Sequence, residues 1–237
     1  MYCVANTNPR PAVSAAKANR LYWLGRYAER VYLSLHFMRK YSDRMVDGDS
    51  GDFAGYYTSL DVKDVNRDKT QLNLDYMYDS SNPASILSGL VSANDNAILL
   101  REEIKSETLS YIQMSLCHIR QCAERAESNI TALQPVTDHL LAFWGSVDSR
   151  PVDPQARCLI RVGKLVEDAD MHIRFGYPYE RVMEYYNELG QLAAIEPGIF
   201  DSASRGRLRE LLTPARYGAG ESYRRDLISA LGRVVTI

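Results

Sequence analysis

The sequence predicts an all-α protein that folds as a single-domain bundle of about 8–10 helices around a long central first helix. Three observations support this prediction. Proline, glycine and helix-capping residues divide the chain into stretches of helical length. Within those stretches apolar residues recur with the period of a helix face. No stretch shows the alternation of apolar and polar residues that is typical of a half-buried strand.

The expected helices are delimited by capping and breaking residues. Ser14 is suited to cap the first helix, and Ser106 is suited to cap a later one. Asn82-Pro83 combines a cap with the residue type favoured at the first helical position. The clearest linker is the segment 149–154, which contains two prolines. The expected helices span residues 14–43, 52–60, 69–79, 83–105, 106–129, 135–147, 154–176, 178–195, 201–212 and 220–233.

Length and composition indicate an ordinary globular protein. The chain has 237 residues, of which 46% are apolar and 24% are charged. A formal charge of −2 gives no field that would recruit nucleic acid or an anionic membrane. The four cysteines form no CxxC pair, and neither a signal peptide nor a membrane-spanning apolar run is evident. We therefore expect a cytoplasmic protein with a flexible N-terminus at 1–13 and one domain at 14–237.

The first helix has two apolar faces. One consists of Leu21, Leu24, Ala28, Val31, Leu35 and Met38, and the opposite one of Trp23, Tyr27, Phe37 and Tyr41. A helix that is apolar on both sides lies either at the centre of its bundle or at a subunit interface. The second alternative would make the protein a homo-oligomer that associates through the Trp23 face.

A faint internal repeat relates the first helix to residues 157–175. When Gly25 is aligned with Gly163, Arg26 falls on Lys164 and Glu29 on Glu167. The repeat would divide the domain into pseudo-symmetric halves, residues 14–149 and 154–237. Any two amphipathic helices share an apolar stripe, so a chance match remains the alternative.

Charged residues beside the apolar faces are the candidates for a functional site. Glu29 and Arg30 project beside apolar surface, where an unpaired charge is costly. Asn94 and Arg101, in a later helix, lie between two apolar arcs and should point inward. A guanidinium binds a carboxylate bidentately, so Arg101 is a natural partner for Glu29 or Glu167. We therefore predict that Glu29, Arg30 and Arg101 form an inward-facing cluster, which would serve as a structural brace or as a functional site.

The sequence contains no motif for metal or nucleotide chemistry. No histidine follows a glutamate at the Glu-x-x-His spacing of di-iron bundles. Asp168, Asp170 and His172 are close in sequence, but Asp170 should point away from the other two on a helix. HExxH, Walker A, GxGxxG and GxSxG are all absent. We therefore expect no metal site and no cofactor of the chain's own.

Three segments carry a family resemblance. Residues 18–37 contain Glu29-Arg30 within LYWLGRYAER, residues 82–109 begin with Asn-Pro-Ala-Ser-Ile, and residues 157–175 match more weakly. Together these segments resemble the alpha-E family, bacterial helical proteins named for a Glu-Arg motif.

The chain departs from the family pattern at several positions. Asn94-Asp95 stands where the family has Arg and Glu, Leu109 stands near its usual Trp, and Asp168 replaces Arg in the second Glu-Arg-like site. A ligand site shared by typical members would be altered at these positions.

The resemblance implies a functional context. Alpha-E proteins are typically encoded beside, or fused to, circularly permuted ATP-grasp proteins, which activate a carboxylate as an acyl phosphate and pass it to an amine. The resemblance thus implies an accessory or co-catalytic subunit of an ATP-grasp-dependent amide or peptide ligation system, acting on a peptide or amino acid. ATP and Mg would be bound by the partner, because this chain has no phosphate-cradling loop.

On this hypothesis the catalytic candidates are Glu29, Arg30 and Arg101, and the ligand-binding candidates are Tyr22, Arg26, Asn94, Glu107 and Glu167. Glu107 also has a simpler role, because an acidic residue stabilises a helix N-terminus. Two alternatives remain open: a stand-alone enzyme with a polar pocket between helices, and a non-catalytic adaptor that oligomerises.

Overall fold

A computed structural model of the chain describes residues 13–46, 53–60, 62, 68–149 and 153–236. The all-α prediction is confirmed: the regular structure of these residues is helical, apart from an isolated β-bridge between Phe200 and Val235. The segment expected to be a flexible N-terminus falls, except for Val13, outside the described residues.

The described helices follow the predicted order closely. They are α1 (Ala15–Val46), α2 (Phe53–Ser59), α3 (Lys69–Tyr78), α4 (Ile86–Leu99), α5 (Arg101–Ile104), α6 (Ser106–Glu124), α7 (Gln134–Ser149), α8 (Pro154–Arg174), α9 (Tyr179–Ile195), α10 (Ser202–Leu211) and α11 (Glu221–Leu231). Two short 3₁₀ turns, η1 (Ile130–Leu133) and η2 (Pro197–Ile199), precede α7 and α10.

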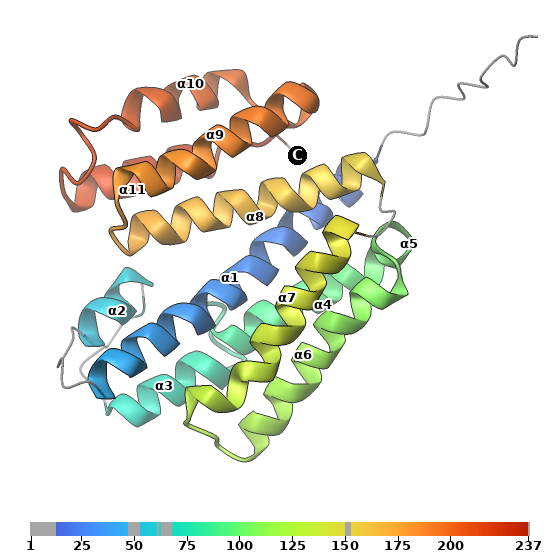
Figure 1. The fold of residues 1–237 in the computed structure, drawn as a ribbon, viewed down its shortest axis with the longest axis vertical. Helices are drawn as coiled ribbons and strands as arrows, with labels where there is room; N and C mark the ends of the chain where they lie inside the picture. The colour runs from blue at the N-terminus through green and yellow to red at the C-terminus, as the bar shows by residue number, and fades with distance from the viewer. Residues whose placement is uncertain (1–12, 47–52, 61, 63–67, 150–152, 237) are drawn as a thin grey trace, which may run out of the picture.

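The first helix is central, as predicted. It packs against α8 on one side and α4 on the other, while α6 and α7 extend the α4 side and α9 to α11 cover the α8 side (Figure 1). Leu21, Leu24 and Ala28 have no exposed surface, and Trp23 and Tyr27 on the other face are half-buried. Because both faces of α1 contact other helices, it connects the two groups of helices.

The predicted helix 83–105 is wrong at both ends. Asn82 Oδ1 accepts a hydrogen bond from the Ala84 N–H and makes a turn, so Ser85 becomes the N-cap of α4 by accepting from the Ser88 N–H. At the other end the helix breaks at Leu100, and α5 is a separate single turn. This break raises the ten expected helices to eleven among the described residues. It also changes the direction in which Arg101 points.

Two glycines bring α1 and α8 into backbone contact. A Cβ added to Gly25 would lie 2.1 Å from the Ile160 carbonyl oxygen, and one added to Gly163 would lie 2.1 Å from the Tyr22 carbonyl oxygen. The contact is reciprocal, because each glycine meets the residue three positions before the other. The repeat segment 157–175 therefore packs directly on the first helix. Whether the remaining helices of the two halves also superpose stays a prediction.

Candidate functional site

The glycine crossing places charged side chains of both helices in a buried network. The position four residues after a helical glycine lies on the face of the glycine, which here is the α1–α8 contact, and the position directly after the glycine lies beside that face, from where a long side chain reaches the contact. The ion pairs at this contact join four cations and four carboxylates: Arg26, Arg30, Lys164 and Arg174 with Glu29, Glu167, Asp168 and Asp170. All eight residues belong to α1 or α8.

Glu167 is the anionic centre of one half of the network. Arg26 Nε lies 2.5 Å from its Oε2, and Arg30 donates from Nε to Oε1 at 2.6 Å and from Nη2 to Oε2 at 3.2 Å. Burial alone would raise the pKa of Glu167, but the guanidiniums of Arg30 and Arg26 outweigh it and hold the pKa below its usual range. Glu167 therefore stays ionised although only 1% of its surface is exposed.

Asp170 extends this half of the network. It accepts a hydrogen bond from Arg26 Nη2 at 3.1 Å and from Arg174 Nε at 2.6 Å. Arg26 Nη1 also donates to the Tyr22 hydroxyl at 3.1 Å. The guanidinium of Arg26 thus connects three buried groups, which fixes the register of α1 against α8.

Glu29 lies in the opposite environment. Lys164 Nζ lies 3.1 Å from Glu29 Oε1 and 2.8 Å from Asp168 Oδ2, so two carboxylates share one ammonium. Glu29 Oε2 is buried and has no hydrogen-bond partner among the described residues. Burial raises the pKa of Glu29 well above its usual range, and the neighbouring carboxylate of Asp168 adds to the rise. Glu29 therefore holds a proton more readily than an ordinary glutamate.

Equivalent positions of the repeat make equivalent ion pairs in the two halves of the network, except at one position. The residue after each glycine pairs with the glutamate four residues after the other glycine, giving Arg26–Glu167 and Lys164–Glu29. At the following position α1 has Arg30 and α8 has Asp168. Glu167 consequently gains a second cation, whereas Glu29 gains a second anion.

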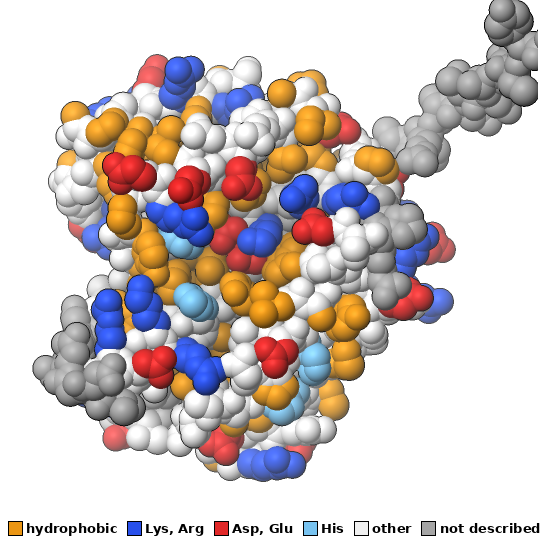
Figure 2. All heavy atoms as spheres, viewed as in Figure 1, with side chains coloured by type: hydrophobic (Ala, Val, Ile, Leu, Met, Phe, Trp, Pro, Cys, Tyr) orange, Lys and Arg blue, Asp and Glu red, His pale blue; other side chains and the backbone are white. Residues whose placement is uncertain are grey.

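A hollow of about 240 Å³ opens beside Arg30. Its lining residues come from five segments and are Arg30, Leu60, Tyr76, Ala84, Glu167, Met171 and Arg174. Figure 2 shows Lys, Arg, Asp and Glu side chains gathered over α9 and α8 and toward the helices below α8, with apolar surface between them. Glu167 and Arg30 therefore belong both to the buried network and to a cavity wall.

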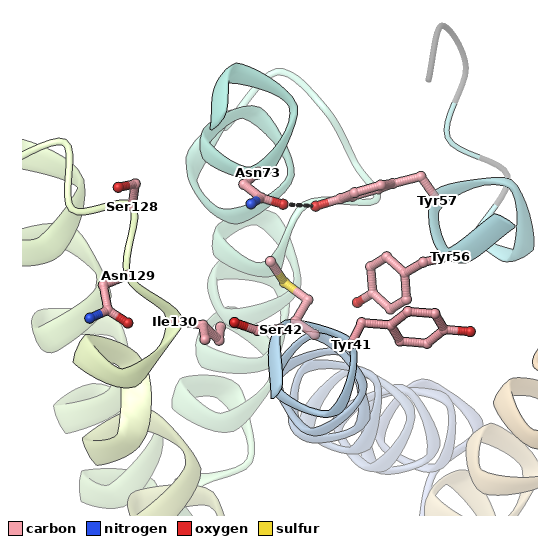
Figure 3. Close-up of a pocket in the computed structure, with 9 residues that line it drawn as sticks. Tyr41, Ser42, Tyr56, Tyr57, Asn73, Ser128, Asn129 and Ile130 are labelled. Atoms are coloured by element: carbon pink, nitrogen blue, oxygen red, sulfur yellow. Dashed lines mark hydrogen bonds between the residues drawn. The ribbon is translucent and has the colours of Figure 1, made fainter. Parts of the chain in front are cut away.

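A second hollow, of about 100 Å³, lies near the end of α1 (Figure 3). Tyr41, Tyr56 and Tyr57 line it, and the Tyr57 hydroxyl donates to Asn73 Oδ1. No charged side chain is among its described lining residues. It is smaller than the hollow beside Arg30 and offers fewer groups for chemistry.

The structure brings together some of the predicted site residues and separates others. Tyr22, Arg26 and Glu167, predicted to bind a ligand, join Glu29 and Arg30 in the network. The place of these residues in the fold is thereby established, while their role in catalysis or binding stays a prediction.

The inward position predicted for Arg101 is wrong. Arg101 is exposed, because the break at Leu100 turns the chain before it. Asn94 also lies elsewhere: it is half-buried on the α6 side of α4, in an open hollow with Gln113 and Arg120. Glu107 is exposed in the first turn of α6, where its charge suits the helix N-terminus.

Sequence reasoning missed Lys164, Asp168, Asp170 and Arg174 as members of the network. Two signals were available. Lys164–Asp168 and Asp170–Arg174 have the four-residue spacing of ion pairs on a helix. The Gly25–Gly163 alignment also matched a base with a base and an acid with an acid, which gives cross-pairing when the two helices pack face to face.

Glu29-Arg30 differs from the other Glu-Arg dipeptides of the chain in its burial. The sequence contains three such dipeptides, and the other two are exposed: Glu124-Arg125 at the C-terminal end of α6 and Glu180-Arg181 in α9. Only 1% of the Glu29 surface is exposed, and Arg30 is half-buried. A Glu-Arg motif with a role inside the fold is therefore best assigned to Glu29-Arg30.

The fold and the site define an all-α domain whose central helix contributes a Glu-Arg pair to a buried ion-pair network. The chain belongs to the Alpha-E family, described as a predicted alpha-helical domain with a conserved ER motif, whose model matches residues 14–189. Comparisons with curated proteins and with solved structures give no significant match. None of the described helices is long and apolar enough to cross a lipid bilayer.

Proposed function

We propose that this protein is an accessory or co-catalytic helical subunit of an ATP-grasp-dependent amide or peptide ligation system. The observation that carries the proposal is the position of Glu29-Arg30. Arg30 is bound to the buried network through Glu167 and at the same time lines the hollow of about 240 Å³. The family motif thus connects a rigid electrostatic centre to a space that a small substrate can enter.

The proposal divides the chemistry between two proteins. The ATP-grasp partner would bind ATP and Mg and form the acyl phosphate. This chain would hold one of the two reactants, since Arg30 offers guanidinium donors at the hollow. The raised pKa of Glu29 also gives the network a carboxyl group that keeps its proton to higher pH than an ordinary glutamate does.

A reconstituted reaction tests the proposal. The full-length chain would be combined with a circularly permuted ATP-grasp protein from the same genome, and ATP-dependent amide formation would be followed by mass spectrometry. We expect Glu29→Gln to keep the melting temperature and to abolish ligation, because Gln resembles the protonated carboxyl but cannot release the proton. Glu124→Gln, in an exposed Glu-Arg dipeptide, is the matched control and should leave ligation unchanged. Full ligation by Glu29→Gln, or full ligation without this chain, would reject the proposal.

The aromatic face of α1 favours a second candidate, a non-catalytic adaptor. Trp23 and Tyr27 stay half-buried, their ring centroids are 5.3 Å apart, and they line an open hollow of about 380 Å³ with Arg20 and Asn96. An adaptor that oligomerises through this face would lose its assembly on Trp23→Asp. Light scattering on the wild-type chain and this variant measures the change, and an unaltered mass for both excludes this candidate.

A further inference from the structure

We propose that the hollow beside Arg30 binds a small organic carboxylate that carries an apolar group. Assigning this ligand as a reactant of the ligation rests on the proposed function, whereas the binding site itself is argued from the geometry alone. The hollow of about 240 Å³ is lined by two arginines, Arg30 and Arg174, by the Glu167 carboxylate that Arg30 binds, by Tyr76 and by apolar residues.

Arg30 has donors left after its ion pair is made. Its Nε and Nη2 donate to the two oxygens of Glu167, which occupies one edge of the planar guanidinium. The other edge presents Nη1, for which the described residues provide no hydrogen-bond partner, and the Arg30 side chain is 34% exposed. A guanidinium with one free edge can donate two hydrogen bonds to a second carboxylate.

Glu167 does not neutralise Arg30 completely, because it is shared. The same carboxylate also accepts from Arg26 Nε at 2.5 Å, so two guanidiniums divide one negative charge. Arg26 is bound in turn to Asp170 and is only 7% exposed, so it is held away from the hollow. Arg30 is thus the guanidinium of this pair that faces an entering anion.

Tyr76 adds a polar group without adding charge. Its hydroxyl lies 2.9 Å from Ser34 Oγ. Burial raises the pKa of Tyr76 to about 12, so the phenol remains neutral at physiological pH and does not repel an anion.

The apolar part of the lining selects an organic acid over inorganic phosphate. Leu60, Ala84 and Met171 offer apolar surface that a phosphate ion would leave unfilled. Phosphate also brings a second negative charge toward Glu167. The volume of the hollow lies below the range of about 300–1,000 Å³ typical of sites for drug-sized ligands, so the ligand should be of amino-acid size.

Titration calorimetry on the full-length chain tests the site directly. The probes are N-acetyl-leucine, its uncharged analogue N-acetyl-leucinamide, and inorganic phosphate. We expect the acid to bind, and the amide and phosphate to bind at least about tenfold more weakly, because only the acid satisfies both the guanidinium edge and the apolar wall. Equal affinity for acid and amide, tighter binding of phosphate, or no binding of the acid would overturn the proposal.

Two variants separate binding from folding. Arg30→Gln removes the guanidinium and should weaken binding of N-acetyl-leucine at least about tenfold. Ala84→Phe fills the hollow from an exposed turn, leaves the ion pairs intact and should weaken binding to a similar extent. Arg125→Gln, at the arginine of an exposed Glu-Arg dipeptide, should bind as the wild type does. Wild-type affinity in folded Arg30→Gln or in Ala84→Phe would place the ligand elsewhere.

The two proposals fail in different ways. If the acid does not bind but Glu29→Gln still abolishes ligation, the carboxylate site is wrong and the proposed function stands. If the acid binds with the expected dependence on Arg30 but no ligation is found with any ATP-grasp partner, the site stands and the proposed function is wrong.

Discussion

Glu29 and Glu167 occupy equivalent positions on α1 and α8, yet their carboxylates have opposite second neighbours. Glu167 is bound by two guanidiniums, and the pKa of its carboxyl lies below the usual range. Glu29 shares Lys164 with Asp168, and the pKa of its carboxyl lies well above the usual range. Ionisation of Glu167 therefore stabilises the fold, and ionisation of Glu29 destabilises it.

The pH dependence of stability should therefore change in a defined direction in Glu29→Gln. The folded state holds the Glu29 proton more tightly than the unfolded state, so stability falls as pH rises from the ordinary glutamate pKa toward the raised one. Glutamine cannot titrate and removes this decrease. We expect the variant to be at least as stable as the wild type at pH 7, with a flatter profile in urea unfolding measured from pH 4 to pH 8. A variant that is much less stable at pH 7 would contradict the shared-ammonium environment.

Glu167→Gln is the matched substitution at the equivalent position. Its carboxyl has a lowered pKa, so its contribution is present above the ordinary glutamate pKa and is lost as pH falls through the lowered one. Removing it leaves Arg26 and Arg30 without their shared carboxylate. We expect a loss of about 3–5 kcal/mol at pH 7 in the same urea experiment.

The members of the network could be predicted only in part from the sequence. Burial beside apolar residues was sufficient to predict that Glu29 and Arg30 need partners. The identity of those partners depends on which helix packs against α1. The apolar periodicity of a single helix shows which of its faces is buried but not which other helix covers that face. Arg101, the partner expected from the fourth predicted helix, is exposed. The partners observed are Lys164 for Glu29 and Glu167 for Arg30, and each lies 135 or more residues after the residue it binds.

At the scale of elements, the α1–α8 contact depends on the absence of two side chains. Gly25→Ala or Gly163→Ala would place a Cβ 2.1 Å from a backbone carbonyl oxygen, which cannot move aside as a flexible side chain can. The helices would have to separate, which would loosen the ion pairs that join α1 to α8. We expect a loss of about 1–3 kcal/mol or more for each substitution, measured by urea unfolding.

Gly145→Ala is the control for the glycine substitutions. Gly145 lies inside α7, and an added Cβ would have nothing within 4 Å. Alanine there should stabilise the protein by about 0.5–1 kcal/mol through helix propensity. Equal effects at Gly145 and Gly25 would show that helix propensity, and not the close approach, governs these positions.

Most helices could be predicted from the sequence because their ends carry local signals. Asp153 caps α8, which has Pro154 as its first residue, and the Asp68 side chain caps α3 by accepting from the Gln71 N–H. The break at Leu100 has no such signal, since neither glycine nor proline is near it. Leu100 and Ile104 are both fully buried, but residues four apart share one face of a continuous helix as well, so their burial does not account for the break.

At the scale of the whole molecule, the central position of α1 and α8 predicts an order of local stability. Backbone amides of α1 between Leu24 and Leu35 and of α8 between Leu159 and Ile173 lie where burial is densest. They should exchange hydrogen through global unfolding, whereas the shorter, more exposed α10 should open locally and exchange faster. Hydrogen exchange followed by mass spectrometry measures both. Protection in α10 equal to that in α1 would indicate a single cooperative unit.

The reciprocal glycine contact has the form of an isologous interface, in which residue i meets residue j and residue j meets residue i. Two identical chains that associate in this way can form only identical sites, because the dyad copies every substitution to both. When both helices belong to one chain, that constraint is lifted. Arg30 and Asp168 occupy equivalent positions with opposite charge, so one contact supplies both a cation-rich and an anion-rich environment. A dimer of identical halves could not assign one environment to binding an anion and the other to holding a proton.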